Sequence, residues 1–340
     1  MFIRVRVLIL TVNKKNKYLL LILALIGGLI AASCTKDLTG GIPSFGTNVV
    51  VDGNIETSKP PIIVLTRSTK VFGDLNVNNI ASFLLHGATM YMTVDSNPTQ
   101  IPLQEICLQS LAIPDSQKLQ LLQTLGILVY DSSTVPDICA YTLPYPELIT
   151  YANTGNCPDC GIEGHKYNLN IKYNGQTITS YTTIPYATGI TGLSIRDVPH
   201  VDSLVNVLAT INVPASYGNF IRYWTKRNEE PFYTSITGSV YDNLILAGQT
   251  ISLPVQRGEP SYITNPDPNT FGYFWKGDTV TVKWASIDSR TYDFFNTIEN
   301  DGGGSPFSSY IRVKSNVVGD SAIGIWAGYG ARYYTIIVPR

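Results

Sequence analysis

The chain has 340 residues, of which only 14% are charged, and its formal net charge is −1. This balance, with no run rich in Lys or Arg beyond residue 33, argues against nucleic acid and anionic lipid surfaces as partners. The 28 glycines, 20 prolines and 21 tyrosines, in a chain poor in strong helix formers, favour short strands separated by turns over long helices.

Residues 1–33 are predicted to be a lipoprotein signal peptide. A lysine cluster at 14–17 precedes the apolar run 18–30, and three small residues follow at 31–33. A basic start, a short apolar segment and small residues before a cleavage point are typical of secreted proteins. The alternative is a membrane-spanning helix, which normally needs about 20 apolar residues. Removing this leader would leave 19 basic and 25 acidic residues, a net charge of −6.

The residue that follows the leader, Cys34, is predicted to be a lipid attachment point. The small residues before it resemble the lipobox of bacterial lipoproteins, and this resemblance implies lipidation of its thiol and contact with the lipid bilayer. Several acyl chains on one residue give stable anchoring; a free or disulfide-bonded Cys34 is the alternative. Residues 34–48 would form a lipid-anchored tether. Lys36-Asp37 partly matches the export signal of surface lipoproteins, so we expect an outer-membrane protein, with the cell surface favoured over the periplasmic face.

Residues 49–186 are predicted to form an N-terminal, immunoglobulin-like β-sandwich domain with a cysteine-containing insertion. Its clearest unit is 165–185, where two alternating runs flank Asn174-Gly175. This dipeptide predicts a two-residue hairpin, because a type I′ turn needs positive φ at both central residues. Other elements are strands at 47–56, 60–69 and 87–95 and a short amphipathic helix at 117–126.

Residues 187–340 are predicted to form a second, β-rich C-terminal domain, with the boundary just after Pro185. Val280, Val282 and Trp284 alternate with polar residues and indicate a strand at 278–288. Further strands are expected at 203–214, 219–228, 309–317, 322–330 and 332–340.

A helix is predicted at 289–300, because Tyr292, Phe295 and Ile298 recur every three residues and would share one stripe. A glycine-rich loop is expected to follow it at 301–309. The expected fold class is therefore mostly β, with two β-sandwich-like domains and short helical inserts.

Four cysteines besides Cys34 lie in the expected N-terminal domain, and an even number in an oxidising compartment predicts disulfides. Of the three possible pairings, Cys107–Cys139 with Cys157–Cys160 is favoured. A zinc site is one rival, because Cys157 and Cys160 have zinc-knuckle spacing, although the other two cysteines are 32 residues apart. A redox-active pair is another rival, weakened because no thioredoxin-like βαβ pattern surrounds it.

The sequence carries no motif for catalysis or cofactor binding, and we expect no catalytic residue, metal or cofactor. The motifs G-x-S-x-G and H-E-x-x-H are absent. Segment 272–279 has glycines at phosphate-loop spacing, but Asp278 stands where the lysine would be. The acidic loops 265–272 and 299–304 lack an ordered set of calcium ligands. Surface or locally hydrogen-bonded roles are expected for the three histidines, His86, His165 and His200.

Aromatic residues gather at 220–235 and at 271–275. Such groups can stack on sugars or anchor a protein partner, and the alternative is that most of them fill the core. Ligand or partner contacts are expected at Trp224, Tyr233 and Trp275.

Segments along nearly all of the mature chain resemble the DUF4249 family, lipoproteins of the Bacteroidota. The most specific part is the closing pattern: Pro306-Phe307-Ser308, then Ser315-Asn316, then Gly324-Ile325-Trp326-Ala327-Gly328-Tyr329. Members are often encoded beside TonB-dependent outer-membrane receptors, which implies a non-enzymatic accessory or ligand-binding role in nutrient uptake. Two alternatives stay open. One is an envelope glycan or peptide hydrolase, marked by two carboxylates in a cleft; the other is a structural or adhesive surface lipoprotein.

Overall fold

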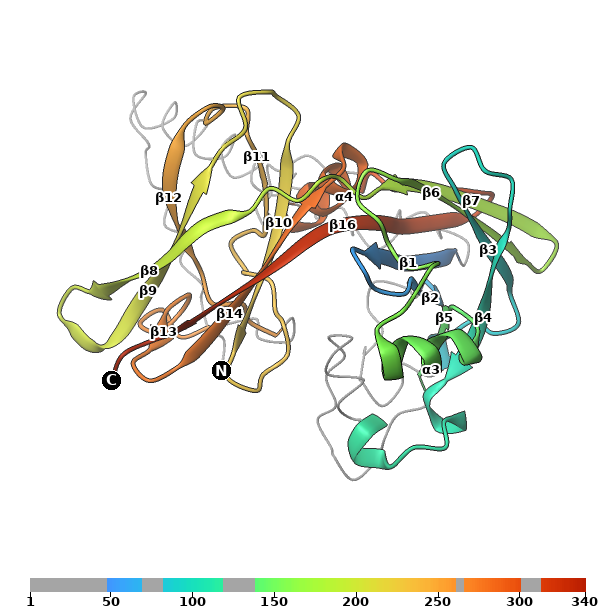
Figure 1. The fold of residues 1–340 in the computed structure, drawn as a ribbon, viewed down its shortest axis with the longest axis horizontal. Coiled ribbons are helices and arrows are strands. Elements are labelled where there is room, and N and C mark those ends of the chain that lie inside the picture. Colours follow the sequence, from blue (N-terminus) through green and yellow to red (C-terminus); the bar gives the residue numbers. More distant parts are fainter. Residues whose placement is uncertain (1–47, 69–81, 119–137, 261–265, 301–312) are drawn as a thin grey trace, which may run out of the picture. The chain divides into compact units, whose positions relative to one another are not determined.

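The computed structural model describes residues 48–68, 82–118, 138–260, 266–300 and 313–340 (Figure 1). The chain divides into two compact units, residues 1–45 and 46–340, and every described residue lies in the second unit. The expected signal peptide, Cys34 and nearly all of the tether lie outside the described residues. So do residues 119–126 of the expected helical insert and the glycine-rich loop at 301–309.

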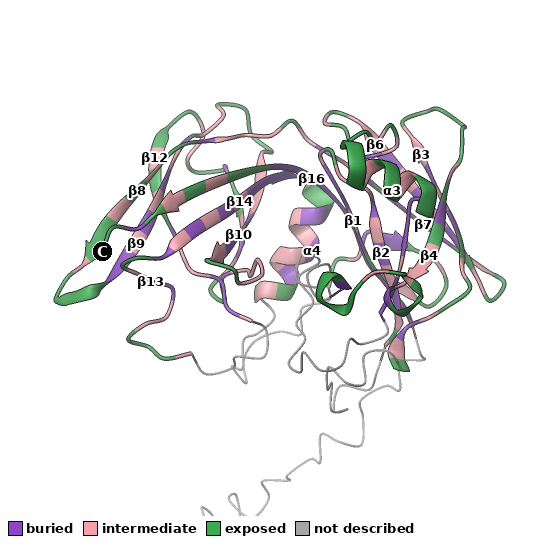
Figure 2. Ribbon diagram, turned by 60° about the horizontal axis from the view of Figure 1, so that its bottom comes forward, coloured by how far each residue is buried: buried purple, intermediate pink, exposed green. Residues whose placement is uncertain are grey.

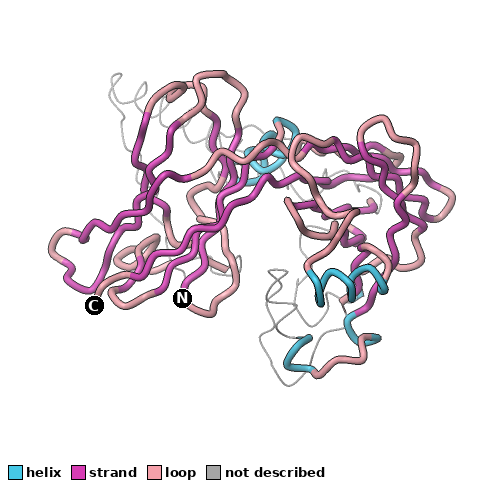
Figure 3. Tube along the Cα trace, viewed as in Figure 1, coloured by secondary structure: helices cyan, strands magenta, loops and turns pink. Residues whose placement is uncertain are grey.

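Strands make up 49% and helices 12% of the structure, which confirms the predicted mostly β, sandwich-like fold (Figure 3). Among the described residues the strands form two sheets. In spatial order, the larger sheet contains β11 (Val240–Asp242), β10 (Phe220–Arg227), β14 (Thr279–Ile287), β16 (Ala322–Ile337), β1 (Val49–Glu56), β2 (Ile62–Arg67), β5 (Cys139–Thr142), β4 (Ile101–Cys107), β3 (Thr89–Val94), β6 (Lys166–Tyr173), β7 (Gln176–Thr183) and β15 (Val317–Val318). The smaller sheet contains β12 (Thr250–Val255), β9 (Val201–Asn212), β13 (Phe274–Trp275) and β8 (Ile190–Val198).

Strands β6 and β7 form the hairpin that the sequence predicts. Asn174 and Gly175 have φ angles of 47° and 76°, as a two-residue turn with two left-handed positions requires. The alternating residues of β6 point into the core, where Tyr167, Leu169 and Ile171 are each 1% exposed. Turn chemistry and side-chain alternation thus fix the same register.

Strand β16 is one continuous strand, whereas two strands, 322–330 and 332–340, were predicted. The prediction was wrong because Gly330 serves a close approach of two backbones and does not form a turn. A Cβ atom on Gly330 would lie 2.2 Å from the carbonyl oxygen of Pro185. β16 therefore continues to Ile337, pairing with β1 along residues 322–329 and with β14 along residues 330–337.

The parallel pairing of β1 with β16 joins the region before Pro185 to the region after it in one sheet. The pairing runs from Val49, opposite Ala322, to Glu56, opposite Tyr329. β14 continues the sheet through its antiparallel pairing with β16. Strands β1, β16, β14 and β10, the central strands, are therefore neighbours in space although they come from opposite ends of the chain (Figure 1).

The first core is built around Trp326, which is completely buried and is the largest fully buried side chain of the described residues. Its indole N–H donates to the carbonyl oxygen of Tyr167 at 3.1 Å. Gly53 lies against the indole, and a Cβ atom there would meet the ring at 2.9 Å. The structure has two further cores. One lies between the two sheets, around Val282 and Trp284. The other lies beneath the helix that follows β14, whose buried positions are purple in Figure 2.

That helix, α4 (Ser289–Asn300), has the predicted bounds, but its buried stripe is shifted by one residue. Thr291 and Phe294 are buried at 0% and 8% exposure, whereas Ile298 is 45% exposed. Tyr292 and Phe295 of the predicted stripe are partly buried at the side of the helix. Asp288 caps the helix by accepting the backbone N–H of Thr291 at 2.8 Å, and the packing of Phe294 into the third core decides which stripe is buried.

The structure also holds a helix that the sequence analysis missed, α3 (Tyr145–Thr154), and a short 3₁₀ helix at Leu108–Ser110. α3 has a proline in its first turn and ends at Gly155, whose φ is 71°, which are ordinary start and stop signals. None of the helices in the described part of the chain combines the length and apolar character needed to cross a membrane.

Candidate functional site

The most unusual surface of the molecule is one face of the central strands, which we call the charged face. It carries side chains from all four strands, and α4 packs against part of it. Its members are Asp52 and Glu56 from β1, Arg222 and Trp224 from β10, Lys283 from β14, and Tyr329 and Tyr333 from β16.

Strand register brings these residues together. Trp224 is paired with Lys283, and Lys283 with Tyr333, so the three side chains point to the same side of the sheet. On β1, Glu56 is paired with Tyr329. Because side chains alternate along a strand, the neighbours of these residues point the other way, into the apolar cores.

Glu56 is the centre of a buried ion-pair network. Its carboxylate lies 2.6 Å from the ammonium group of Lys283 and 2.7 Å from that of Lys59. It also accepts a hydrogen bond of 2.5 Å from the hydroxyl of Tyr333. The side chains of Glu56 and Lys283 are only 6% and 15% exposed, whereas that of Lys59 is 43% exposed. The two buried charges thus neutralise each other away from water.

Burial is the largest influence on the ionisation of this network. In Glu56 it would raise the pKa, but the Lys283 and Lys59 ammonium groups together outweigh it, and the pKa of the carboxyl lies below its usual value. In Lys283, burial lowers the pKa and Glu56 restores only part of it. Burial, reinforced by the Glu56 carboxylate, raises the pKa of the Tyr333 hydroxyl. The ionised forms of Glu56 and Lys283 therefore depend on each other.

Arg222 is the second fixed cation of the charged face, with a side chain only 11% exposed. Its guanidinium donates to the hydroxyl of Tyr329 at 3.3 Å and to Ser239 Oγ at 3.2 Å. Its Nη2 lies 4.0 Å from a carboxylate oxygen of Glu299 on α4. The guanidinium also stacks on Phe295, 3.2 Å from the ring centroid. These contacts hold Arg222 in one orientation.

The Arg222 guanidinium lowers the pKa of both Tyr329 and Asp52, against the effect of burial. Burial raises the pKa of Tyr329 to about 12, an effect that Arg222 partly opposes. The side chain of Asp52 stays accessible to water. Protein atoms around it nevertheless desolvate its carboxyl and raise the pKa, an effect that the positive charge of Arg222 partly opposes. Asp52 is therefore the exposed acidic group of the charged face, beside a cation that is already held in place.

Trp224 is the one predicted contact residue that the structure places on the charged face. It is partly buried, packs edge-on against Tyr329 with ring centroids 5.2 Å apart, and has the Lys283 ammonium 4.5 Å from its ring centre. Such cation–π contacts stabilise a partly desolvated ammonium group.

The other two predicted contact residues lie elsewhere. Tyr233 forms a backbone bridge with Thr225, with N–H to O distances of 2.9 Å in both directions. Trp275 lies in β13, where the guanidinium groups of Arg227 and Arg257 lie 4.8 and 4.6 Å from its ring centre. The structure therefore places Trp275 in the smaller sheet, whereas the backbone of Tyr233 pairs with β10 next to Trp224.

The charged residues of the face were missed, and the sequence did hold a signal for them. Asp52 interrupts the apolar run of β1, and Lys283 stands between Val282 and Trp284 in β14. Charged residues inside otherwise apolar strands indicate that one face of the strand does not belong to an apolar core. Their partners Arg222 and Tyr329 could not be found in this way, because only strand pairing brings them close.

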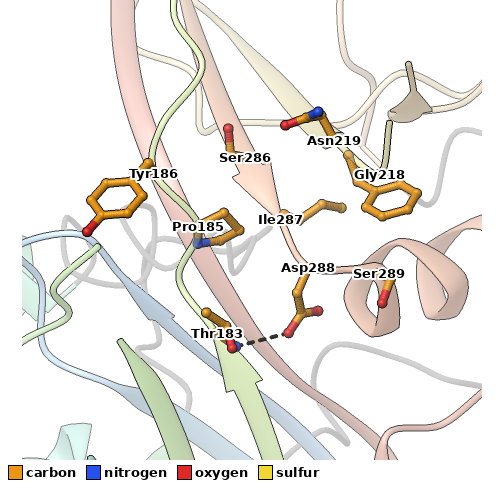
Figure 4. Close-up of a pocket in the computed structure, with 10 residues that line it drawn as sticks. Thr183, Pro185, Tyr186, Gly218, Asn219, Ser286, Ile287, Asp288 and Ser289 are labelled. Carbon is orange, nitrogen blue, oxygen red and sulfur yellow. Dashed lines mark hydrogen bonds between the residues drawn. The ribbon is translucent and has the colours of Figure 1, made fainter. Parts of the chain in front are cut away.

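A separate pocket of about 240 Å³ lies where the end of β7 meets the start of α4 (Figure 4). The charged residue in its lining is Asp288, whose carboxylate accepts hydrogen bonds from Thr182 Oγ1 at 2.9 Å and from the backbone N–H groups of Thr183 and Thr291 at 3.0 and 2.8 Å. The carboxylate is fully used in joining β7 to the helix. We therefore assign this pocket a structural role.

The structure pairs Cys107 with Cys139 and Cys157 with Cys160, the pairing favoured from the sequence. The first bond joins residues directly opposite each other in β4 and β5. The second lies in the turn that precedes β6, next to Gly161, whose N–H donates to the carbonyl oxygen of Lys59.

The three histidines have surface or locally hydrogen-bonded positions, as expected. His86 and His165 each contact a carboxylate through Nδ1 at 2.6 Å, that of Glu105 and that of Asp95. His200 is an exposed turn residue with a φ of 64°. In the described part of the acidic loop at 266–272, Asp267 accepts hydrogen bonds from Asn269, which closes a local turn.

One family model matches the chain over residues 35–333, and its description is "Domain of unknown function (DUF4249)". The match covers well over half of the chain and includes every residue of the charged face. No curated protein matches the chain.

Proposed function

We propose that this protein, which belongs to the DUF4249 family, is a non-enzymatic accessory lipoprotein of the outer membrane that binds a ligand or partner segment for a TonB-dependent nutrient receptor. The observation that carries the proposal is the charged face. Its buried ion pairs and oriented guanidinium cost desolvation energy that an apolar sheet face would avoid. Such perturbed groups, gathered on one surface, mark a recognition site.

The arrangement favours binding over catalysis. The Glu56 carboxylate is occupied by two ammonium groups and a phenol, so it has little capacity left to accept a substrate proton. Asp52 lies four residues from Glu56 on the same extended strand, so their Cα atoms are about 13 Å apart. The exposed groups offered to a polar ligand are therefore the Asp52 carboxylate and the Lys59 ammonium group, because the Glu56–Lys283 pair is already neutralised.

The envelope location in this proposal depends on Cys34. Lipidation of this residue would anchor the folded unit through residues 35–48, and the Cys34→Ala variant should leave the membrane fraction or keep its leader. Protease added to intact cells should degrade the wild-type protein if it lies on the cell surface. A Cys34→Ala protein that is cleaved normally and still sediments with membranes would contradict the anchor.

The partner in this proposal is a β-barrel receptor of the outer membrane. Extraction in mild detergent and affinity capture of the protein should recover such a receptor, identified by mass spectrometry. Asp52→Asn should reduce its recovery, because this change removes the exposed charge of the face. Asp202→Asn is the control, since Asp202 is also an exposed aspartate but lies on strand β9 of the other sheet.

The two results separate the parts of the proposal. If affinity capture of the protein from wild-type cells recovers no receptor, the accessory role is contradicted. Equal recovery with Asp52→Asn and Asp202→Asn contradicts the assignment of the charged face as the contact surface.

A further inference from the structure

Four residues with the chemistry of zinc ligands converge at one end of strands β4 and β5. Possible ligand atoms of His86, Glu105, Cys107 and Cys139 all lie within 4.8 Å of one another. Within the described residues, no other group of three or more His, Cys, Asp or Glu side chains meets this condition. The group lies apart from the charged face and from the family's closing sequence pattern.

Strand pairing explains the convergence. Cys107 and Cys139 are directly opposite in the β4–β5 pair, with Cα atoms 3.9 Å apart. Glu105 precedes Cys107 by two residues, so the two side chains lie on the same face of β4. His86 reaches this face from the segment before β3, and its Nδ1 lies 2.6 Å from Glu105 Oε1.

The second oxygen of Glu105 is also held. Glu105 Oε2 accepts a hydrogen bond of 2.9 Å from the backbone N–H of Gly87. The carboxylate is thus oriented by the backbone next to His86, and partners of this kind raise the affinity of metal ligands by fixing their direction. His86 itself is exposed and leaves a path from solvent to the group.

In the oxidised protein both sulfurs belong to the disulfide and cannot act as thiolate ligands. Reduction by a dithiol delivers two electrons and two protons, breaks the S–S bond, gives two Cys thiols and converts the dithiol to its own disulfide. Zinc binding then displaces the two thiol protons. The resulting set of two thiolates, one imidazole and one carboxylate suits tetrahedral Zn²⁺.

The geometric change required is small. In a tetrahedral site with zinc–sulfur distances of about 2.3 Å, the two sulfurs lie about 3.8 Å apart. Rotation of the two Cys side chains about their Cα–Cβ bonds accounts for most of that separation, while the strands keep their register. The His86 and Glu105 ligand atoms already lie beside the sulfurs.

We propose that reduction of the Cys107–Cys139 disulfide creates a zinc site formed by His86, Glu105, Cys107 and Cys139, so that zinc and the disulfide are mutually exclusive states of the same strand pair. This site differs from the zinc knuckle considered for Cys157 and Cys160, and it does not depend on the proposed function.

The test measures zinc bound by the full chain in mild detergent, with Cys34, Cys157 and Cys160 replaced by serine so that no other thiols remain. A phosphine reductant is used, because added thiols would compete for the metal; it takes up the oxygen of a water molecule as the disulfide gains two hydrogens. After dialysis against Zn²⁺, the reduced protein should hold one equivalent of zinc and the oxidised protein none. With Co²⁺ in place of zinc, thiolate charge-transfer absorption should appear only in the reduced sample.

Ligand variants identify the site. His86→Ala in the reduced protein should weaken zinc binding by more than about 100-fold, since even groups that only orient zinc ligands contribute about 10–100-fold. His165→Ala is the matched control, because His165 forms the same 2.6 Å contact with a carboxylate, that of Asp95, without nearby cysteines. It should bind zinc like the parent.

Three results would overturn the proposal. The first is a folded, reduced protein that binds no zinc. The second is an equal loss of affinity in His86→Ala and His165→Ala. The third is a loss of structure on reduction, followed by circular dichroism, that zinc does not reverse, because the ligands converge only in the paired strands.

Discussion

The two faces of the central strands differ in chemistry: one is apolar and close-packed, and the other carries a network of charged and phenolic side chains. On one face, β1 and β16 send Val51, Ile55 and Trp326 into a core where each is at most 1% exposed. On the other face, the same strands present Glu56 and Tyr329 to Lys283 and Arg222. The comparison shows that adjacent residues of one strand can belong to a close-packed apolar interior and to an ion-pair network, separated only by the thickness of the sheet.

The two faces depend on different physics. The apolar face is stabilised by burial and close packing, which are not directional and tolerate little loss of volume. The charged face is stabilised by matched partners, so its energy depends on whether each charge keeps its counter-charge. Mutations on the apolar face should therefore destabilise the protein by removing buried volume, and mutations on the charged face by leaving a charge without its counter-charge.

The largest effect is expected on the apolar face. Trp326→Ala removes the largest fully buried side chain and its hydrogen bond to Tyr167. We expect the free energy of unfolding to fall by about 3–5 kcal/mol, measured by urea denaturation. Ile337→Ala, on the same strand but 71% exposed, is the control and should change it by less than about 0.5 kcal/mol. Similar losses in both variants would contradict the packing described for Trp326.

The second effect tests the charged face. Glu56→Gln preserves volume but leaves the Lys283 ammonium without its main counter-charge. We expect a loss of about 2–4 kcal/mol, slightly below the value for fully buried pairs because Lys283 is 15% exposed. Adding Lys283→Met should restore most of it, since the ammonium group that lost its counter-charge is then removed. If the double variant is less stable than Glu56→Gln, charge matching is not what stabilises this face.

The third effect is the pH dependence of the same network. The pKa of Glu56 is lower in the folded protein than its ordinary value of 4.5, so the folded state binds fewer protons than the unfolded state in this range. Its contribution to stability is fully present above pH 4.5 and is lost as the pH falls through the lowered value. Thermal unfolding between pH 6 and pH 3 should show a smaller acid-induced loss in Glu56→Gln than in the wild type. Parallel curves would show that Glu56 has no special role.

The smallest effect should come from Lys59, which contacts the same carboxylate from the solvent side. Its side chain is 43% exposed and also lies over the ring of Tyr333, 4.6 Å from the centroid. Lys59→Ala should cost about 0.5–1 kcal/mol, as exposed ion pairs do, and added salt should shrink the difference further. A cost equal to that of Glu56→Gln would mean that the exposed lysine, and not Lys283, balances the carboxylate.

Local features of this protein were predictable from the sequence because their causes are local. The hairpin of β6 and β7 follows from Asn174-Gly175 between two alternating runs. The bounds of α4 follow from its composition, but its buried face did not. Packing against the strands beneath the helix made Phe294 the buried aromatic in place of Phe295.

Gly330 shows the limit of reading glycines as turns. In the sequence it predicts the end of a strand, yet in the structure it lets the backbone at Pro185 cross closely over β16. The function of a glycine depends on what approaches it, and the approaching segment lies far away in the chain.

The sequence by itself determined the β-rich composition, several of the strands with their alternation, the tight hairpin and the cysteines available for pairing, because these depend on residues close together in the chain. Only the tertiary structure decided that β1 pairs in parallel with β16, that Glu56 meets Lys283, and that His86 and Glu105 meet the Cys107–Cys139 bond. Side-chain alternation states which residues share a face of one strand. Which faces then meet is set by strand order and register, and these follow from packing over the whole chain.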